Sequence, residues 1–153
     1  MTRKLVSLLL AFVFLLGCTS LSASATENEE LGNIIYFDDG SYIEVVIEES
    51  YTRAASTKTG YKLYRYRDSN DNIEWEADLT ATFTYDGTTS TCTGANCVVT
   101  IYENAWYEIS NTTTYSGNTA TTHLTLGQKF LGITISKPQY TIALTCDKDG
   151  NLS

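Results

Sequence analysis

One histidine and one row of carboxylates are the side chains of this sequence that could perform acid–base chemistry. The histidine is His123, which a Ser-His-Asp triad or a Cys-His pair would have to use. No Gly-x-Ser-x-Gly motif accompanies it. We therefore interpret His123 as an exposed residue on the solvent-facing side of a strand.

The carboxylates are Glu74, Glu76 and Asp78, and they alternate with apolar residues. Alternate residues of a strand lie on the same face about 7 Å apart, a separation within the range of the paired carboxylates of glycosidases. Acidic side chains are also ordinary on the wet face of a strand. We interpret the row as solvated surface and keep a glycan hydrolase as the lesser alternative.

Two short stretches offer oxygen ligands at alternate positions, as a calcium-binding loop does. They are residues 68–72 (DSNDN) and 147–151 (DKDGN). The first has Ile73 in place of the bend glycine and Leu79 in place of the bidentate glutamate, and the second is followed by too few residues. We interpret both as polar turns and expect no bound metal or cofactor.

Aromatic residues are the remaining candidates for a ligand-binding surface, because flat exposed rings can stack on sugars. Tyr64 and Tyr66 lie on the opposite face of their strand from Leu63, and Trp106 and Tyr107 begin another strand. Most rings of this kind pack in the core or across strands. We take these two tyrosines together with Trp106 and Tyr107 as the candidate ligand-facing aromatics.

The first residues predict export. Residues 2–4 (TRK) form a short segment with two basic residues, as the start of a signal peptide does. The apolar run of residues 5–16 (LVSLLLAFVFLL) has signal-peptide length and is too short to span a bilayer. Small residues at 23–25 (ASA) predict cleavage that removes residues 1–25 and frees a secreted protein. The alternative is a lipid anchor at Cys18, although Leu16 stands where a lipobox usually has a small residue.

The cysteines point to a disulfide rather than to a metal site, since an exported chain oxidises thiols more readily than it binds metal with them. Either fate of the signal leaves Cys92, Cys97 and Cys146. A Cys92–Cys146 bridge would close about 55 residues and contribute roughly 4 kcal/mol, against roughly 2 kcal/mol for Cys92–Cys97, which closes about 6. We predict the longer bridge with Cys97 free, and the shorter bridge is the alternative.

Acidic residues outnumber basic ones by 18 to 10, and the net charge is −8. Nucleic acids and anionic membranes both need positive surface, so this balance argues against them as partners. Residues 27–49 are rich in acids and contain no base. We interpret residues 26–55 as a peripheral acidic segment with a short hairpin, turning at residues 38–40 (DDG), and a linker. The folded domain is placed at residues 56–153.

The body of the chain has the pattern of short strands separated by turns. The clearest strand is residues 74–85 (EWEADLTATFTY), where polar and apolar residues alternate throughout. Further strands are expected at residues 61–67, 98–102, 106–109, 119–126, 130–136 and 140–146. This pattern predicts an all-β, antiparallel β-sandwich, with an immunoglobulin-like strand order as a candidate.

Several short motifs lie along residues 56–153. They are STKTG at 56–60, Trp75 followed by Leu79 and by TFTYDG at 82–87, Cys92-Thr93, Trp106, SGNTA at 116–120 and LTCDKDGNLS at 144–153. As a set they resemble an uncharacterised group of small secreted β-rich proteins of Gram-positive, Clostridia-type bacteria. The resemblance implies export, a β-rich body and bacterial origin, and it implies no activity.

These observations favour a secreted or surface-associated, non-enzymatic protein that acts by binding, with a cell-surface glycan or a protein as its partner. The alternatives are a carbohydrate-binding module, a glycan hydrolase and a secreted antibacterial protein. We expect no membrane-spanning segment. A flat, exposed platform of the four candidate aromatics would favour the carbohydrate-binding module, and their burial would argue against it.

Overall fold

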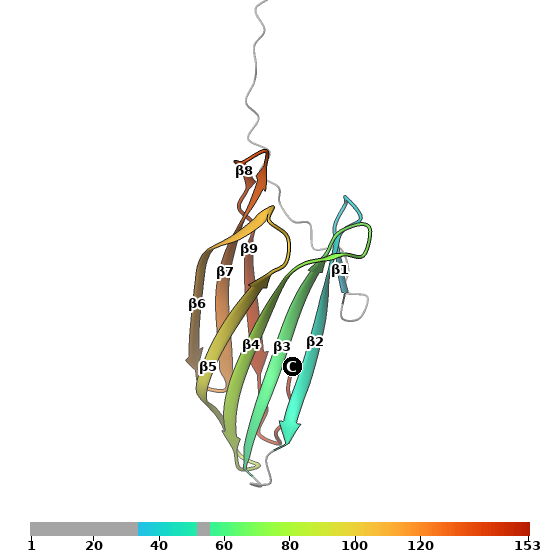
Figure 1. The fold of residues 1–153 in the computed structure, drawn as a ribbon. Helices are drawn as coiled ribbons and strands as arrows, with labels where there is room; N and C mark the ends of the chain where they lie inside the picture. The colour runs from blue at the N-terminus through green and yellow to red at the C-terminus, as the bar shows by residue number, and fades with distance from the viewer. Residues whose placement is uncertain (1–33, 52–55) are drawn as a thin grey trace, which may run out of the picture.

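The computed structural model describes residues 34–51 and 56–153, which form an all-β sandwich of two antiparallel sheets, as predicted (Figure 1). The first sheet contains, in spatial order, β1 (Ile34–Tyr36), β2 (Tyr42–Tyr51), β3 (Thr57–Arg67), β4 (Ile73–Tyr85) and β5 (Ser90–Ile101). The second contains β6 (Trp106–Ser116), β7 (Thr119–Phe130), β8 (Ile133–Ser136) and β9 (Gln139–Thr145). The predicted signal peptide and the alternative lipid site at Cys18 lie outside the described residues.

Neighbouring strands of the first sheet are consecutive in the sequence, so this sheet is a meander. The chain then passes to the second sheet between β5 and β6. There β7 pairs with β6 along one edge and with β8 and β9 along the other. An immunoglobulin domain joins its sheets by Greek-key crossings, so the strand order found here is simpler than that arrangement.

The core lies between the two sheets and is built from the alternating residues that the sequence predicts. The inner face of β4 is fully buried along its length and consists of Trp75, Ala77, Leu79, Ala81 and Phe83. The second sheet contributes Ala120, Leu124, Leu126, Ile142 and Leu144. Because successive side chains of a strand point to opposite faces, the polar residues of β4 lie on the outside of the first sheet.

One end of this core is aromatic. The rings of Tyr66 and Trp75 stack with their centroids 5.5 Å apart, and Trp106 meets them edge-on at 5.3 and 6.2 Å. Tyr140 of the second sheet lies 5.0 Å from Trp75. Burial raises the pKa of the Tyr140 hydroxyl well above its ordinary value. These contacts join the two sheets at the end where β3 meets β4.

The acidic hairpin belongs to the first sheet, which differs from the peripheral segment expected from the sequence. β2 pairs with β3 along its whole length, and Ile43 is buried in the core. Two acids of β2 form salt bridges with bases of β3: Glu44 lies 3.0 Å from Arg65, and Glu49 lies 3.0 Å from Lys58. A run of like charge along the chain is therefore compensated across the sheet.

Three turns share one design, at residues 37–41, 68–72 and 147–151. In each, the first residue donates its backbone N–H to the fifth and accepts from the fourth. The fourth residue has a left-handed backbone: φ is 82° at Gly40, 71° at Asp71 and 88° at Gly150. This is a three-residue hairpin loop with a left-handed last residue. The expected turn at residues 38–40 is confirmed in this three-residue form.

Candidate functional site

Polar and aromatic side chains gather on the outer face of the first sheet. The strand register places these residues, because the buried positions of β4 alternate with outward ones. We call this surface the outer sheet face; it comprises Tyr42, Glu44, Glu48, Tyr61, Leu63, Arg65, Glu76, Asp78 and Val98.

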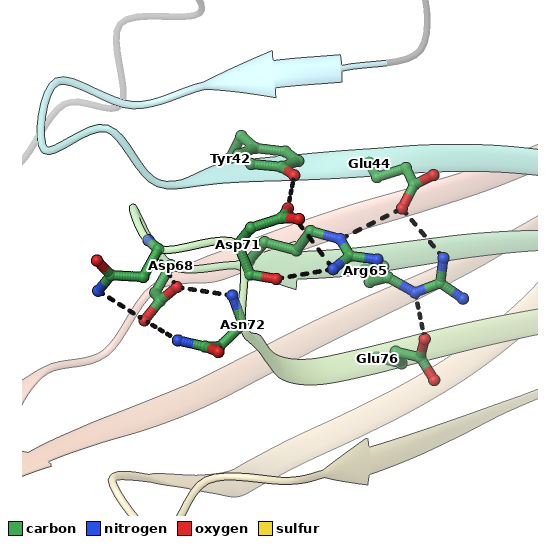
Figure 2. Close-up of polar contacts among 9 residues, drawn as sticks. Tyr42, Glu44, Arg65, Asp68, Asp71, Asn72 and Glu76 are labelled. Atoms are coloured by element: carbon green, nitrogen blue, oxygen red, sulfur yellow. Dashed lines mark hydrogen bonds and ion pairs between the residues drawn. The ribbon is translucent and has the colours of Figure 1, made fainter.

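Arg65 organises one end of the outer sheet face (Figure 2). Its guanidinium lies between two carboxylates from the neighbouring strands, Glu44 on β2 at 3.0 Å and Glu76 on β4. Tyr102 also donates its hydroxyl to Glu76 at 2.7 Å. Burial opposes ionisation of Glu76, but the hydrogen bonds from Tyr102 and Arg65 hold its pKa below the ordinary value. The three strands are thus joined by a charged network.

A second set of contacts continues this network toward the turn at residues 68–72. Arg67 donates to the backbone carbonyl of Asp71 at 2.9 Å and lies 3.6 Å from Glu44. Tyr42 donates its hydroxyl to the Asp71 carboxylate (Figure 2). The side chains at this end of the face are therefore held in place by several partners each.

The two stretches that resembled calcium loops use their carboxylates within the turn. Asp68 accepts from the backbone N–H groups of Asn70 and Asn72 at 2.9 and 2.8 Å, and from the Asn72 side chain at 3.0 Å. Asp147 makes the same contacts with Asp149 and Asn151. These hydrogen bonds hold the pKa of each carboxylate below its ordinary value, and they explain why the residue types recur at this spacing.

Asp78 occupies the middle of the outer sheet face. Its register partners are Leu63 on β3 and Val98 on β5, so apolar side chains flank it on both sides. Its Oδ1 atom is buried and has no hydrogen-bond partner in the described chain. Burial, followed by the nearby charges of Glu48 and Glu76, raises the pKa of this carboxyl above its ordinary value. Among the three carboxylates of the row, Asp78 is therefore the one whose Oδ1 has no hydrogen-bond partner in the described chain.

The predicted aromatic platform is not formed. Tyr66 and Trp106 are buried in the aromatic end of the core, and Tyr64 packs against the core. Tyr107 is on the other sheet, paired with Gly127 of β7. The prediction is wrong for Tyr66 because Leu63, which was assumed to mark the inner face of β3, points outward, so that Tyr64 and Tyr66 point inward. Trp106 is buried because it packs against Tyr66 and Trp75.

Other tyrosines lie at the outer face of the first sheet, and the sequence reasoning did not select them. Tyr36 and Tyr42 lie with ring centroids 5.7 Å apart near the first turn, Tyr61 shares the face of Leu63 on β3, and Tyr102 follows β5. Tyr36 and Tyr102 are half exposed, at 50% and 53%. If Leu63 had been assigned to the outer face of β3, the alternation of the strand would have placed Tyr61 on that face too. The positions of Tyr36, Tyr42 and Tyr102 depend on the turns beside them, which the alternation of a strand does not predict.

The remaining candidates for chemistry lie apart from one another. Glu74 accepts from the indole N–H of Trp106, which satisfies that buried nitrogen. His123 is exposed on β7, as predicted, and its Nδ1 lies 3.3 Å from the Thr141 hydroxyl. It is on the second sheet, away from the row of Glu74, Glu76 and Asp78 on β4.

The predicted Cys92–Cys146 bridge is absent. Cys92, Cys97 and Cys146 are free, buried thiols, and burial raises the pKa of Cys92 and Cys97. Each of the two predicted partners donates to a carbonyl of its own chain segment at 3.5 Å, Cys92 to Gly94 and Cys146 to Asp147. Loop entropy concerns the unfolded chain, and it does not by itself place a bond between two thiols of the folded one.

Comparisons with protein-family models, with curated proteins and with solved structures found no match to this chain. In the part of the chain that the structure describes, there is no helix with the length and apolar character to cross a bilayer.

Proposed function

We propose that this protein is exported, is not an enzyme, and binds its ligand on the outer sheet face. The observation that carries the proposal is the environment of Asp78, whose buried Oδ1 lacks a partner beside a preordered network centred on Arg65. A buried acceptor without a partner gains when a ligand donates to it. Side chains that are already held in place also lose little conformational entropy on binding.

The carboxylate row supports binding rather than glycan hydrolysis. A glycosidase needs two carboxyl groups that face the reacting bond. Glu74 accepts from Trp106, and Glu76 accepts from Arg65 and Tyr102. Asp78 alone is left without an internal partner, and one carboxyl cannot serve as both acid and nucleophile or base.

A cell-surface glycan is the ligand class that the tyrosines favour. Tyr61 lies on the outer sheet face, Tyr36 lies at its β1 edge and Tyr102 follows β5, and Tyr36 and Tyr102 are half exposed. Sugars present apolar ring faces together with hydroxyl donors, so rings beside an unpaired carboxylate match both features. This set replaces the buried platform that the sequence suggested.

A glycan array tests the proposal with the chain that begins at Thr26. Bound glycans should be lost in Tyr102→Ala and weakened by about tenfold in Asp78→Asn. Tyr115→Ala is the matched control, because Tyr115 has almost the same exposure, 51%, on the second sheet. Retention of all bound glycans by Tyr102→Ala would contradict the proposed surface, and cleavage of a bound glycan, seen by mass spectrometry, would show an enzyme.

A further inference from the structure

The hairpin between β7 and β8 carries the most exposed apolar side chains of the described chain. They occupy four of six consecutive positions: Phe130 is 65% exposed, Leu131 87%, Ile133 71% and Ile135 59%. We call residues 130–135 the hairpin tip. It projects from the end of the sandwich beyond the neighbouring loops (Figure 1). A contiguous exposed apolar group of this kind marks an interaction surface.

The turn of this hairpin has an unusual residue at its apex. Leu131 and Gly132 both have positive φ, 51° and 80°, as the central residues of a type I′ turn do. That turn favours Asn, Asp or Gly at its first central position, and a bulky side chain with positive φ is an outlier. The sequence thus places a large apolar side chain at the apex against local backbone preference.

Cationic and aromatic residues surround the base of the hairpin tip. Lys129 lies with its Nζ 4.4 Å from the centroid of the Tyr107 ring, and the Tyr107 hydroxyl is 2.8 Å from that of Thr134. Lys137 follows β8 and is exposed. Residues 109–146 contain no acidic residue, and these two lysines are their only Lys or Arg residues.

We propose that the hairpin tip inserts into the interface of a phospholipid bilayer that contains anionic headgroups. The apolar tip would enter the acyl boundary, and Lys129, Lys137 and Tyr107 would lie at the level of the phosphates. Tyrosine and lysine are the residues that favour this depth. The apolar tip and the charges at its base are both complementary to such a surface.

A protein partner fits this surface less well. A stable protein interface takes about 20–30 residues from each side, and the exposed tip is far smaller than that. Insertion into a bilayer needs only the transfer of a few side chains from water. The tip is also convex, so it suits a soft surface rather than a second copy of the same tip.

The net charge of −8 argues against an anionic membrane only if the charge is spread evenly. The acids of the described chain lie mainly on the first sheet and its turns, and residues 109–146 have none. Glu108 on β6 and Glu103 in the loop before it are the acids near the base of the hairpin, since Lys129 donates its backbone N–H to Ala105 of that loop at 2.7 Å. At physiological ionic strength, charges more than about 8 Å away are largely screened. Lys129 and Lys137 would then be the basic groups nearest to the bilayer.

Vesicle flotation tests the proposal with the chain that begins at Thr26 and therefore lacks Cys18. The vesicles contain phosphatidylcholine alone or phosphatidylcholine with phosphatidylglycerol. We expect binding to the second kind that falls at least about tenfold in Leu131→Asn. Asn-Gly is the preferred type I′ sequence, so this variant should fold at least as well as the original chain.

Two further variants make the result specific. Lys129→Gln with Lys137→Gln should remove the preference for phosphatidylglycerol. Ile109→Thr, which removes an apolar side chain exposed to 43% on β6, should bind as the unaltered chain does. Absence of vesicle binding, or equal binding by Leu131→Asn, would overturn the proposal. Sedimentation equilibrium showing a dimer that Leu131→Asn dissociates would overturn it in favour of self-association.

Discussion

The raised pKa of the Asp78 carboxyl makes the stability of the folded chain depend on pH. Its carboxyl sits between apolar neighbours, near two other acids, and its pKa is raised above the ordinary value of 3.8 by burial first and then by Glu48 and Glu76. The folded chain therefore binds a proton at this site at pH values where the unfolded chain has lost it. Stability falls as the pH rises through this window, and the ionised carboxyl remains unfavourable above it.

Asp78→Asn should raise the melting temperature at pH 7, because it removes an unfavourable buried charge while it keeps the shape. We expect a gain of about 2 °C that vanishes below pH 3.8, where the carboxyl is protonated in both states. Thermal unfolding at pH 3 and pH 7 measures the difference. Destabilisation of the variant at pH 7 would mean that the carboxylate has a stabilising partner.

The thiols give a second test at this scale. In the chain that begins at Thr26, Cys92, Cys97 and Cys146 should resist a thiol reagent while the protein is folded, because all three are buried and burial raises the pKa of the first two. All three should react in denaturant without reductant. Reaction of a single thiol under those conditions would reveal a bridge between the other two.

At the scale of elements, Gly127 on β7 leaves room for the ring of Tyr107 on β6, which contacts the hairpin between β7 and β8. The ring of Tyr107 lies so close over Gly127 that a Cβ at this position would overlap it. From there Tyr107 reaches Thr134 on β8 and contacts Lys129. Tyr107, which the sequence suggested as a ligand-facing aromatic, thus also makes contacts that position the hairpin.

Gly127→Ala should destabilise the protein by about 2 kcal/mol, the usual cost of overpacking. The loss should be smaller when Tyr107→Ala is already present, since the overlapping ring has then gone. Gly94→Ala is the control, because nothing lies within 4 Å of a Cβ built at Gly94. Chemical denaturation of the four chains measures the coupling, and equal losses with and without the ring would contradict it.

At the scale of the whole molecule, the first hairpin completes the sandwich. β2 covers the edge of β3 and buries Ile43, whose transfer from water contributes about 2 kcal/mol. The Lys58–Glu49 pair ties β2 to β3, and Lys58 also donates to the carbonyl of Gly150 near the end of the chain. Segments from both ends of the described chain thus meet at one buried lysine.

A chain that begins at Ser56 should therefore fail to unfold cooperatively. It loses β1 and β2, exposes inward-facing residues of β3 and leaves Lys58 without Glu49, a combined cost of roughly 5 kcal/mol or more, which approaches the stability of a small domain. A chain that begins at Asn33 is the control and should melt like the one from Thr26. Calorimetry compares them, and a sharp transition for the shorter chain would restore the domain boundary at residue 56.

The local pattern of the sequence determined the fold class, the faces of β4, β7 and β9, the exposed His123 and the polar turns. These follow from alternation and turn chemistry, which act between residues close in the chain. The tertiary structure decided which face of β3 is buried, because Leu63 and Tyr66 are both able to pack and only the neighbouring strands select between them. It also decided that the acids of β2 meet the bases of β3, and that an apolar hairpin is exposed in the described part of the chain. Each of these depends on pairing between residues distant in the chain, which a local pattern does not contain.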